Sequence, residues 1–371
     1  YNVAIGSGAG QAVTTGIMNT LIGALAGDAI TDGKYNIALG KSALSADTSG
    51  NRSIAIGLGA LETQNFTSDT DAYNIGIGHR AGTAVTTGVQ NTLIGGLAGD
   101  AITTGGGNVA VGYLALTANT TASANNALGV AALAANTTGA DNVAIGTSAL
   151  ASNTTASNNT AVGKGALAVN TTGANNNAFG LGTLQANTTG YENTGLGGGA
   201  ALGTTTGIRN TALGRLALQS NTSGNYNIGL GYNALSTSAT AGGQCTLGDS
   251  NISNLRCNDQ SISALSDSRD KTDVIDSPYG LDFINTVRPV QFKWETRDGN
   301  VKDGSSRLGF IAQELLAATD GNNAVLDLVL DDNPDKLEAK YGNLLPIAIK
   351  AIQEQSALIT ALTDRIAALE G

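Results

Sequence analysis

A glycine recurs every 17 residues through the first two thirds of the chain, with one exception. The repeated unit is clearest in residues 142–155, where Asn-Val-Ala-Ile-Gly precedes Ala-Leu and then Asn-Thr-Thr. A unit of this size cannot bury an apolar face by itself, so the units must stack on one another. The exception is the 21-residue spacing from Gly57 to Gly78. The glycines of the series are Gly6, Gly23, Gly40, Gly57, Gly78, Gly95, Gly112, Gly129, Gly146, Gly163, Gly180, Gly197, Gly214, Gly231 and Gly248.

The unit also predicts the course of each coil. Alternation in Asn-x-Ala-z-Gly, with z apolar, places Ala on one face and its two neighbours on the other. The Ala-Leu pair supplies a second inward point, so we expect two short β segments in each unit. The Asn-Thr-Thr-Gly stretch is typical of turns, and stacking would align its amides into a ladder. The asparagines of this predicted ladder are Asn119, Asn136, Asn153, Asn170, Asn187 and Asn221.

We therefore predict a mainly β fold, with a β-solenoid or β-roll shaft of fifteen repeats over residues 1–250. At about 4.8 Å per rung, the shaft would be roughly 70 Å long. A coil formed by one chain and a helix of three interwound chains both satisfy the repeat. Tyr1 falls inside a repeat, so we expect further chain before it.

Composition supports a repeat and excludes several partners. The chain has 51 Gly, 13% charged residues and a net charge of −10, which disfavours nucleic acid and anionic membranes. No apolar run approaches the length of a membrane span. Residues 1–250 hold 7 of the 19 Lys and Arg and 10 of the 29 Asp and Glu, so charge is concentrated in the last 121 residues. The sole Trp and three of the five Phe also lie there, which predicts a small globular α+β domain.

Few residues can carry other chemistry. We expect Cys245 and Cys257 to be buried or half-buried thiols, with a disulfide as the alternative. Two cysteines and the single His79 are too few for a metal site, and one histidine excludes a Ser-His-Asp triad. We expect no cofactor. The tyrosines beside the repeat glycines are more typical of packing than of a sugar platform.

The end of the chain, from about Gly342, predicts a helix with a heptad seam. Isoleucines recur at seven-residue intervals, and a second series follows three residues later. Ile at one seam position and Leu at the other favour a dimer by themselves. A helix packed on its own domain remains an alternative. The seam residues are Ile352, Ile359 and Ile366, with Gln355, Leu362 and Leu369.

Three motifs in this region resemble one family. They are Ser-Asp-Ser-Arg-Asp-Lys at 266–271, Leu-Gly-Phe-Ile-Ala-Gln-Glu-Leu at 308–315, and Leu-Leu-Pro-Ile-Ala-Ile-Lys-Ala at 344–351. In this order they resemble the endosialidase-type intramolecular chaperone, a self-cleaving domain of phage fibres and tailspikes. The upstream repeats resemble those of phage tail fibres and of trimeric autotransporter adhesin heads.

The resemblance implies domains and a reaction. Residues 251–265 would be a junction, and residues 266–371 a chaperone whose coiled coil spans about 342–370. Ser266 would attack the peptide bond between Leu265 and Ser266, with Lys271 as the base of a serine peptidase that cuts itself once. The lysine must be neutral to accept a proton, and burial favours its neutral form. Five residues is poor spacing for one helical face, so we expect the pair on a turn.

The resemblance also implies a setting. We expect a homotrimeric tail fibre of a bacteriophage virion, folded in the host cytoplasm, with a host-cell surface receptor as partner. A bacterial surface adhesin or another ligand-binding solenoid with the same chaperone is the alternative. Two places are candidates for the receptor contact. One is the insertion within residues 62–71, which carries Phe66 and three acids, and the other is the distal end at residues 232–257. Alternatively, the insertion is a tolerated bulge with no role in binding.

Overall fold

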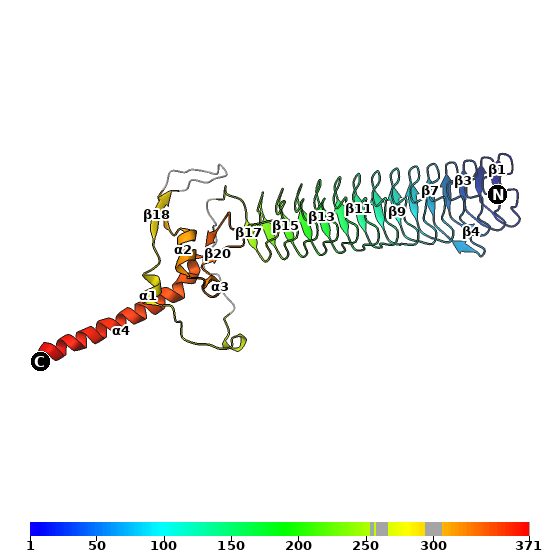
Figure 1. The fold of residues 1–371 in the computed structure, drawn as a ribbon. Coiled ribbons are helices and arrows are strands. Elements are labelled where there is room, and N and C mark those ends of the chain that lie inside the picture. The colour runs from blue at the N-terminus through cyan, green and yellow to red at the C-terminus, as the bar shows by residue number, and fades with distance from the viewer. Residues whose placement is uncertain (253–255, 257–265, 294–305, 371) are drawn as a thin grey trace. The chain divides into compact units, whose positions relative to one another are not determined.

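The structure of the chain is a computed structural model, and it describes residues 1–252, 256, 266–293 and 306–370. The chain forms two compact units, Tyr1–Asp249 and Ser250–Gly371. The first unit, the shaft, is a stack of coils, each carrying one short strand of a continuous sheet (Figure 1). The second unit is a small α+β domain with a long terminal helix.

The shaft sheet has fifteen parallel strands, and each pairs with the strand of the next coil in the same chain. Ala127 pairs with Ala144, for example, 17 residues further on. One chain therefore forms the coil by itself. The strands of this sheet are β1 (Val3–Ile5), β2 (Thr20–Ile22), β3 (Ile37–Leu39), β5 (Ile54–Ile56), β7 (Ile75–Ile77), β8 (Thr92–Ile94), β9 (Val109–Val111), β10 (Asn126–Leu128), β11 (Val143–Ile145), β12 (Thr160–Val162), β13 (Asn177–Phe179), β14 (Thr194–Leu196), β15 (Thr211–Leu213), β16 (Ile228–Leu230) and β17 (Cys245–Leu247).

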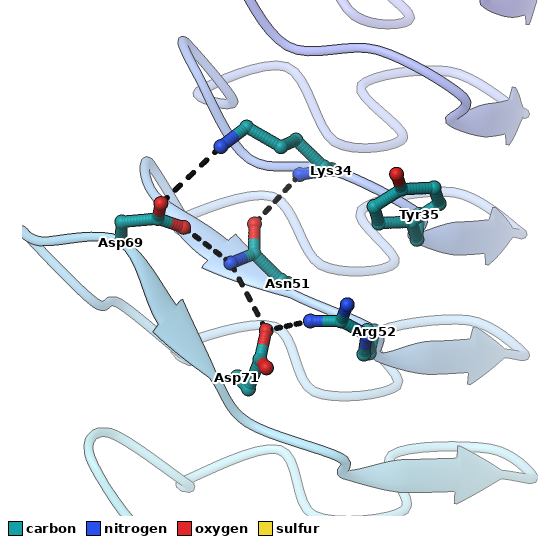
Figure 2. Close-up of a pocket in the computed structure, with 6 residues that line it drawn as sticks. All are labelled: Lys34, Tyr35, Asn51, Arg52, Asp69 and Asp71. Carbon is teal, nitrogen blue, oxygen red and sulfur yellow. Dashed lines mark hydrogen bonds and ion pairs between the residues drawn. The ribbon is translucent and has the colours of Figure 1, made fainter.

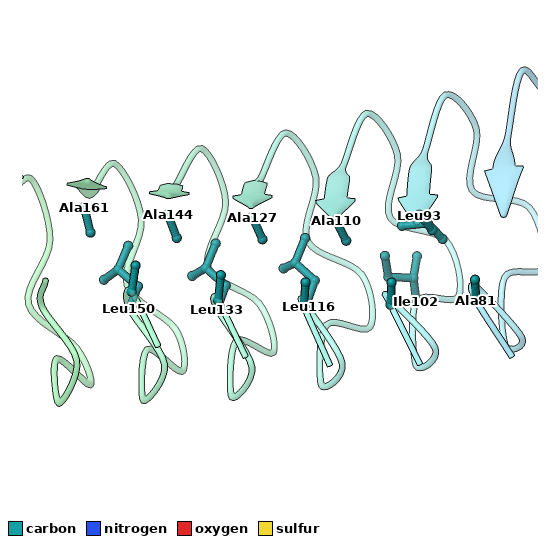
Figure 3. Packing of buried hydrophobic residues seen from close by; sticks show 14 of the residues in the cluster. Ala81, Leu93, Ile102, Ala110, Leu116, Ala127, Leu133, Ala144, Leu150 and Ala161 are labelled. Carbon is teal, nitrogen blue, oxygen red and sulfur yellow. The ribbon is translucent and has the colours of Figure 1, made fainter. Parts of the chain in front are cut away.

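The core of the shaft lies between the sheet and the opposite wall of the coil. The middle residue of a strand, such as Ala144, points inward and meets leucines of the opposite wall, such as Leu133 and Leu150 (Figure 3). These side chains are fully buried. The first and third strand residues point outward, as alternation predicted.

The Ala-Leu segment is not a strand, so the expectation of two β segments per unit is wrong. Leu150 adopts a left-handed conformation with φ 51° and sits in a turn. That conformation costs about 1–2 kcal/mol. Burial of the leucine contributes about 1.5–3 kcal/mol, and the Leu150 amide also bonds to the carbonyl of Ala166 at 3.0 Å. Burial outweighs the strain, and the turn aims the side chain at the core.

The repeat glycines form the expected column. Gly146 has φ 129°, and a Cβ built on it would lie 2.7 Å from the carbonyl carbon of Gly163 in the next coil. The same close approach recurs from Gly129 to Gly146 and from Gly163 to Gly180. Glycine is required here by its conformation and by the backbone above it.

The predicted asparagine ladder is present from Asn119 to Asn187. Each amide nitrogen donates to the side-chain oxygen one coil earlier, at 2.9 Å from Asn153 to Asn136 and 2.8 Å from Asn187 to Asn170. Asn221 is cut off from this ladder, because Thr204 occupies the rung between.

A second ladder, which the sequence interpretation missed, runs along the asparagines that precede the strands. The amide N–H of Asn142 donates to Oδ1 of Asn125 at 3.1 Å, and its side-chain nitrogen donates to the carbonyl of Ala156 at 2.9 Å. This column is fully buried. Its asparagines are Asn19, Asn36, Asn74, Asn91, Asn108, Asn125, Asn142, Asn159, Asn176, Asn193, Asn210 and Asn227.

The insertion between Gly57 and Gly78 forms a small separate sheet. Strand β6 (Thr70–Asp71) pairs in parallel with β4 (Gly50–Asn51) of the preceding coil. Phe66, within this insertion, is buried, with 6% of its surface exposed.

The second unit packs around a small apolar core that includes Leu315, Leu328 and Ile347. Its elements are η1 (Ser268–Asp270), α1 (Leu281–Ile284), β18 (Val290–Lys293), β19 (Ser306–Gly309), α2 (Ala312–Ala318), α3 (Asn323–Leu326), β20 (Val329–Leu330), β21 (Glu338–Ala339), η2 (Tyr341–Asn343) and α4 (Leu344–Glu370). Strands β18 and β19 are antiparallel, as are β20 and β21.

Helix α4 has two parts. Its first turns pack on their own domain, where Leu344, Ile347 and Ala351 are buried and Glu354 accepts a hydrogen bond from the Leu281 amide at 2.7 Å. The alternative of a helix packed on its own domain is therefore correct for this part only. From Ile352 to Glu370 every residue but Glu354 is exposed. The seam residues of this part are 55% to 80% exposed: Ile352, Ile359, Leu362, Ile366 and Leu369.

Candidate self-cleavage site

A single 3-10 turn, η1, brings Ser266 and Lys271 together. Nζ of Lys271 lies 2.6 Å from Oγ of Ser266. The Asp267 carboxylate caps the turn by accepting from the Arg269 amide at 2.9 Å, and the Arg269 guanidinium binds both of its oxygens. The turn closes where the Lys271 amide donates to the carbonyl of Ser268 at 3.3 Å. The two side chains thus meet on a turn, across five positions of sequence.

Charge is arranged to hold this turn. The side-chain hydrogen bonds from Arg269 lower the pKa of Asp267, and the same contact raises the pKa of Arg269. Both groups therefore stay ionised over the physiological range. The bidentate pair fixes the backbone between the serine and the lysine.

The burial expected for Lys271 is not found among the described residues of one chain. Ser266 and Lys271 are both exposed. Leu265, on the other side of the bond that would be cut, lies outside the described residues. The geometry allows a proton to pass between oxygen and nitrogen, but the described part of the chain leaves both side chains open to water.

The second family-like motif forms part of the domain's packing. Phe310 meets the ring of Tyr341 edge-on at 5.3 Å, and Leu315 is 2% exposed. Glu314, from the same motif, pairs with Arg288, whose Nε donates at 2.9 Å. The motif thus joins β19, α2 and the segment before α4, and it contributes no group to the pair at η1.

The remaining candidates are placed as follows. Cys245 is exposed on the outer face of β17, so the expectation of a buried or half-buried thiol is wrong for it. Cys257 lies outside the described residues. His79 is exposed, as expected. Among the described residues, no three His, Cys, Asp or Glu side chains gather as a metal site, and no helix has the length and apolar character of a membrane span.

An exposed apolar strip on the shaft sheet was missed by the sequence interpretation. The outward strand residues form two rows that run over all fifteen strands, and twelve of these side chains are 37% to 59% exposed. The alternation that predicted this face could have revealed the strip, because the third residue of every strand is apolar, although the first is Thr or Asn in seven strands. The twelve are Val3, Ile5, Ile22, Ile37, Leu128, Ile145, Phe179, Leu196, Leu213, Ile228, Leu230 and Leu247.

The chain thus combines a parallel β-solenoid with an α+β unit that carries a serine-lysine turn and a long terminal helix. Residues 266–326 match the family model described as chaperone of endosialidase. The match begins at Ser266, the first residue of the pair. It does not extend to the motif at 344–351. No curated protein and no solved structure matches the chain.

Proposed function

We propose that this chain is a segment of a bacteriophage tail fibre, whose C-terminal unit assembles three chains and then cuts itself off before Ser266. The observation that carries the proposal is the start of the chaperone-family match at a serine whose Oγ lies 2.6 Å from a lysine amine. The repeated shaft upstream is the part that remains after cleavage. Its place would be the virion, and its partner a host-cell surface receptor.

The proposed reaction needs only these two side chains and water. Neutral Lys271 takes the hydroxyl proton as Oγ of Ser266 attacks the carbonyl carbon of Leu265. The carbon–nitrogen bond then breaks, and the Ser266 nitrogen takes a proton from the lysine. An ester now joins Leu265 to Oγ, and water hydrolyses it to a carboxylate and a free hydroxyl. In a trimer, neighbouring copies can cover the pair, which is exposed among the described residues, and favour the neutral lysine.

Two exposed apolar surfaces support association between copies of the chain, and the number three comes from the resemblance to the chaperone family. The heptad seam of α4 is exposed beyond Ile352, and the apolar strip of the shaft spans every coil. An occupant of the strip must be as long as the shaft and must repeat at the same spacing. Further copies of this chain meet both conditions.

Assembly from the C-terminus also solves a problem of register. Sliding one shaft past another by one coil preserves nearly all contacts, so register is weakly specified within the repeat. A trimer that forms first at α4 pins three ends together before the shafts associate. Cleavage afterwards removes the nucleus and leaves the shaft kinetically trapped.

The test is the intact mass of freshly expressed protein and of four variants. We expect wild type to yield a fragment of residues 266–371. Ser266→Ala and Lys271→Ala should stay whole and still assemble. Lys271→Arg should also stay whole, because a guanidinium cannot give up its proton to act as a base. Ser268→Ala, in the same turn, is the matched control and should be cut.

Three results contradict the proposal. One is wild-type protein that stays whole after prolonged incubation. Another is a cut at a different bond, and the third is cleavage of Lys271→Arg at the wild-type rate. Light scattering on Ser266→Ala measures assembly separately, and three chains are expected.

A further inference from the structure

The insertion lies beside the edge of two successive coils and borders an open, polar hollow (Figure 2). Its volume is about 440 Å³, which is within the range of small-ligand sites. Two coils contribute one wall, and the inserted strand β6 contributes the other. The lining residues are Lys34, Tyr35, Asn51, Arg52, Asp69 and Asp71.

Hydrogen bonds fix the polar wall of the hollow. Asn51 accepts from the Lys34 amide at 2.9 Å, and its side-chain nitrogen donates to Asp69 at 2.5 Å and to Asp71 at 3.3 Å. Lys34 pairs with Asp69 at 3.2 Å, and Arg52 pairs with Asp71. The hydrogen bond from Asn51 and the neighbouring Lys34 lower the pKa of Asp69, so it stays ionised.

Hydrogen bonds fix the two carboxylates in place, but both can accept further hydrogen bonds. A carboxylate can accept about four hydrogen bonds. Asp69 accepts two, and Asp71 accepts three, from Asn51, Arg52 and the Tyr73 hydroxyl. The Asp69 side chain is 66% exposed and that of Asp71 43%. The two cations and two carboxylates of the wall cancel, so the hollow has no net charge to attract an ionic ligand. Fixed acceptors beside fixed donors suit a neutral ligand with neighbouring hydroxyls.

Aromatic surface lies next to this wall. The Arg52 guanidinium stacks on Tyr35 and Tyr73, with its carbon 5.3 Å and 5.7 Å from the ring centres. The rings stay 45% and 50% exposed. An aromatic ring beside fixed carboxylates can cover the C–H face of a pyranose while its hydroxyls bond to the wall.

The shaft contains a natural comparison. Arg209 stacks on Tyr191 and Tyr226 at 5.9 Å and 5.5 Å and pairs with Glu192. This second cluster lies on the same edge of the coil, but no inserted strand stands beside it. The stack alone is therefore a feature of the coil edge, and the insertion adds the fixed carboxylates and the wall.

We propose that the hollow at the insertion binds a neutral hexopyranose, either free or as one unit of a polysaccharide. Bidentate hydrogen bonds from vicinal hydroxyls to Asp69 and Asp71 orient the sugar, and Tyr35 covers one edge. As a place of host attachment this site rests on the proposed fibre function, but as a binding site it stands on its own contacts.

The test uses saturation-transfer NMR on the full chain. The probes are methyl α-glycosides of glucose, galactose and mannose, with N-acetylneuraminic acid as a charged comparison. We expect at least one neutral glycoside to bind better than the acid. The double variant Asp69→Asn with Asp71→Asn keeps the shape and should weaken binding at least tenfold. Glu192→Gln at the second cluster is the matched control and should bind as wild type does.

A second variant tests whether the insertion itself, and not only its two carboxylates, is required for binding. Deleting residues 67–70 restores the 17-residue spacing and retains Phe66. The deletion should abolish sugar binding, while the number of chains in the assembly stays unchanged. A neutral oligosaccharide that binds when no methyl glycoside does also supports the site and identifies a polymer as its source.

Three outcomes overturn the inference. They are no binding by any neutral probe, tighter binding of the acid, and equal binding by the double variant. Self-cleavage and assembly mass, measured on the same samples, show whether the proposed fibre function stands independently of this result.

Discussion

At Thr204 one side chain breaks a ladder that joins the coils below it. Oγ1 of Thr204 and Oδ1 of Asn187 are both buried, and neither has a hydrogen-bond partner. In the rungs below, an asparagine nitrogen donates to the oxygen one coil earlier. The side chain of Thr204 is shorter than that of asparagine and does not donate to Oδ1 of Asn187, so this oxygen is left without a donor.

We expect Thr204→Asn to stabilise the shaft by about 1 kcal/mol, because it gives the Asn187 oxygen a donor. The new amide also gains an acceptor in the carbonyl of Gly207, by analogy with Asn187 and Gly190. Hydrogen exchange of the neighbouring coils measures the change. The reverse variant Asn153→Thr should destabilise its coil by about 1–3 kcal/mol, the cost of an unsatisfied buried group. A faster-exchanging Thr204→Asn would contradict the ladder argument.

Asp47 occupies the same column as these asparagines and is fully buried. Its carboxylate accepts from the amides of Gly50 and Phe66 at 3.1 Å and 3.0 Å, and from Nε2 of Gln64 at 2.7 Å. Burial raises the pKa of Asp47 in spite of these bonds. In the window between the unfolded and the folded pKa, the folded chain binds more protons. Stability therefore falls as pH rises through that window and is level above it.

Asp47→Asn removes this pH dependence, yet we expect it to destabilise the shaft at neutral pH by about 1–3 kcal/mol. Its amide nitrogen would face the donor of Gln64, and the charged acceptor would be lost. Hydrogen exchange of peptides that contain Gly50 and Phe66, followed between pH 3 and 7, measures both effects. Asp141→Asn is the control, since Asn158 takes the same left-handed conformation one coil later. Equal hydrogen exchange in the two variants would contradict the predicted role of Asp47 in stability.

At the scale of one coil, the glycine column limits what the repeat can accept. Gly146→Ala adds a Cβ 2.7 Å from the backbone of the next coil, at φ 129°, so the coils must separate. We expect it to lower the melting temperature of the shaft clearly. Gly165→Ser is the matched control, because its Cβ would meet only Nε2 of Gln185, at 4.0 Å, and Ser148 already holds that position with φ 57°. Similar melting of the two variants would show that close stacking is not limiting.

The coil also shows what sequence alone could predict. Period-two alternation around Ala144 predicted the strand and its buried face correctly, because a strand's sides are fixed by its geometry. The Ala-Leu segment was misread, because apolar residues look alike in a strand and in a left-handed turn. The left-handed conformation of Leu150 is stabilised by burial of its side chain in the core, and a local sequence pattern does not reveal such a tertiary contact. The Ser266–Lys271 contact was expected on a turn, but its exposure depends on surroundings that one sequence does not contain.

On the scale of the whole molecule, the apolar strip predicts how shafts associate. Ile145→Glu places a charge in the middle of the strip, and burying it between chains costs several kcal/mol. Val169→Glu is the matched control, because Val169 is 42% exposed, close to the 39% of Ile145, but lies outside the sheet. Light scattering on the cleaved shaft should give three chains for wild type and Val169→Glu. Ile145→Glu should dissociate once its C-terminal unit is gone.

A cleaved wild-type shaft that is monomeric would contradict this arrangement, and so would an Ile145→Glu shaft that stays trimeric. The trimer itself came from resemblance, since the heptad of α4 favoured a dimer by its residue types. The strip is an observation of different origin. It depends on the exposure of twelve side chains in two rows, which becomes visible only when the coils are stacked.

Every coil pairs with the next at the same 17-residue offset, apart from the insertion. Removing residues 130–146 would join Gly129 directly to Thr147, and each remaining strand, ladder and glycine would meet an equivalent partner. Recombination between repeats in a gene can thus shorten or lengthen the shaft by whole coils without redesign of its core. The length of the shaft can therefore change in steps of one coil, independently of the C-terminal unit.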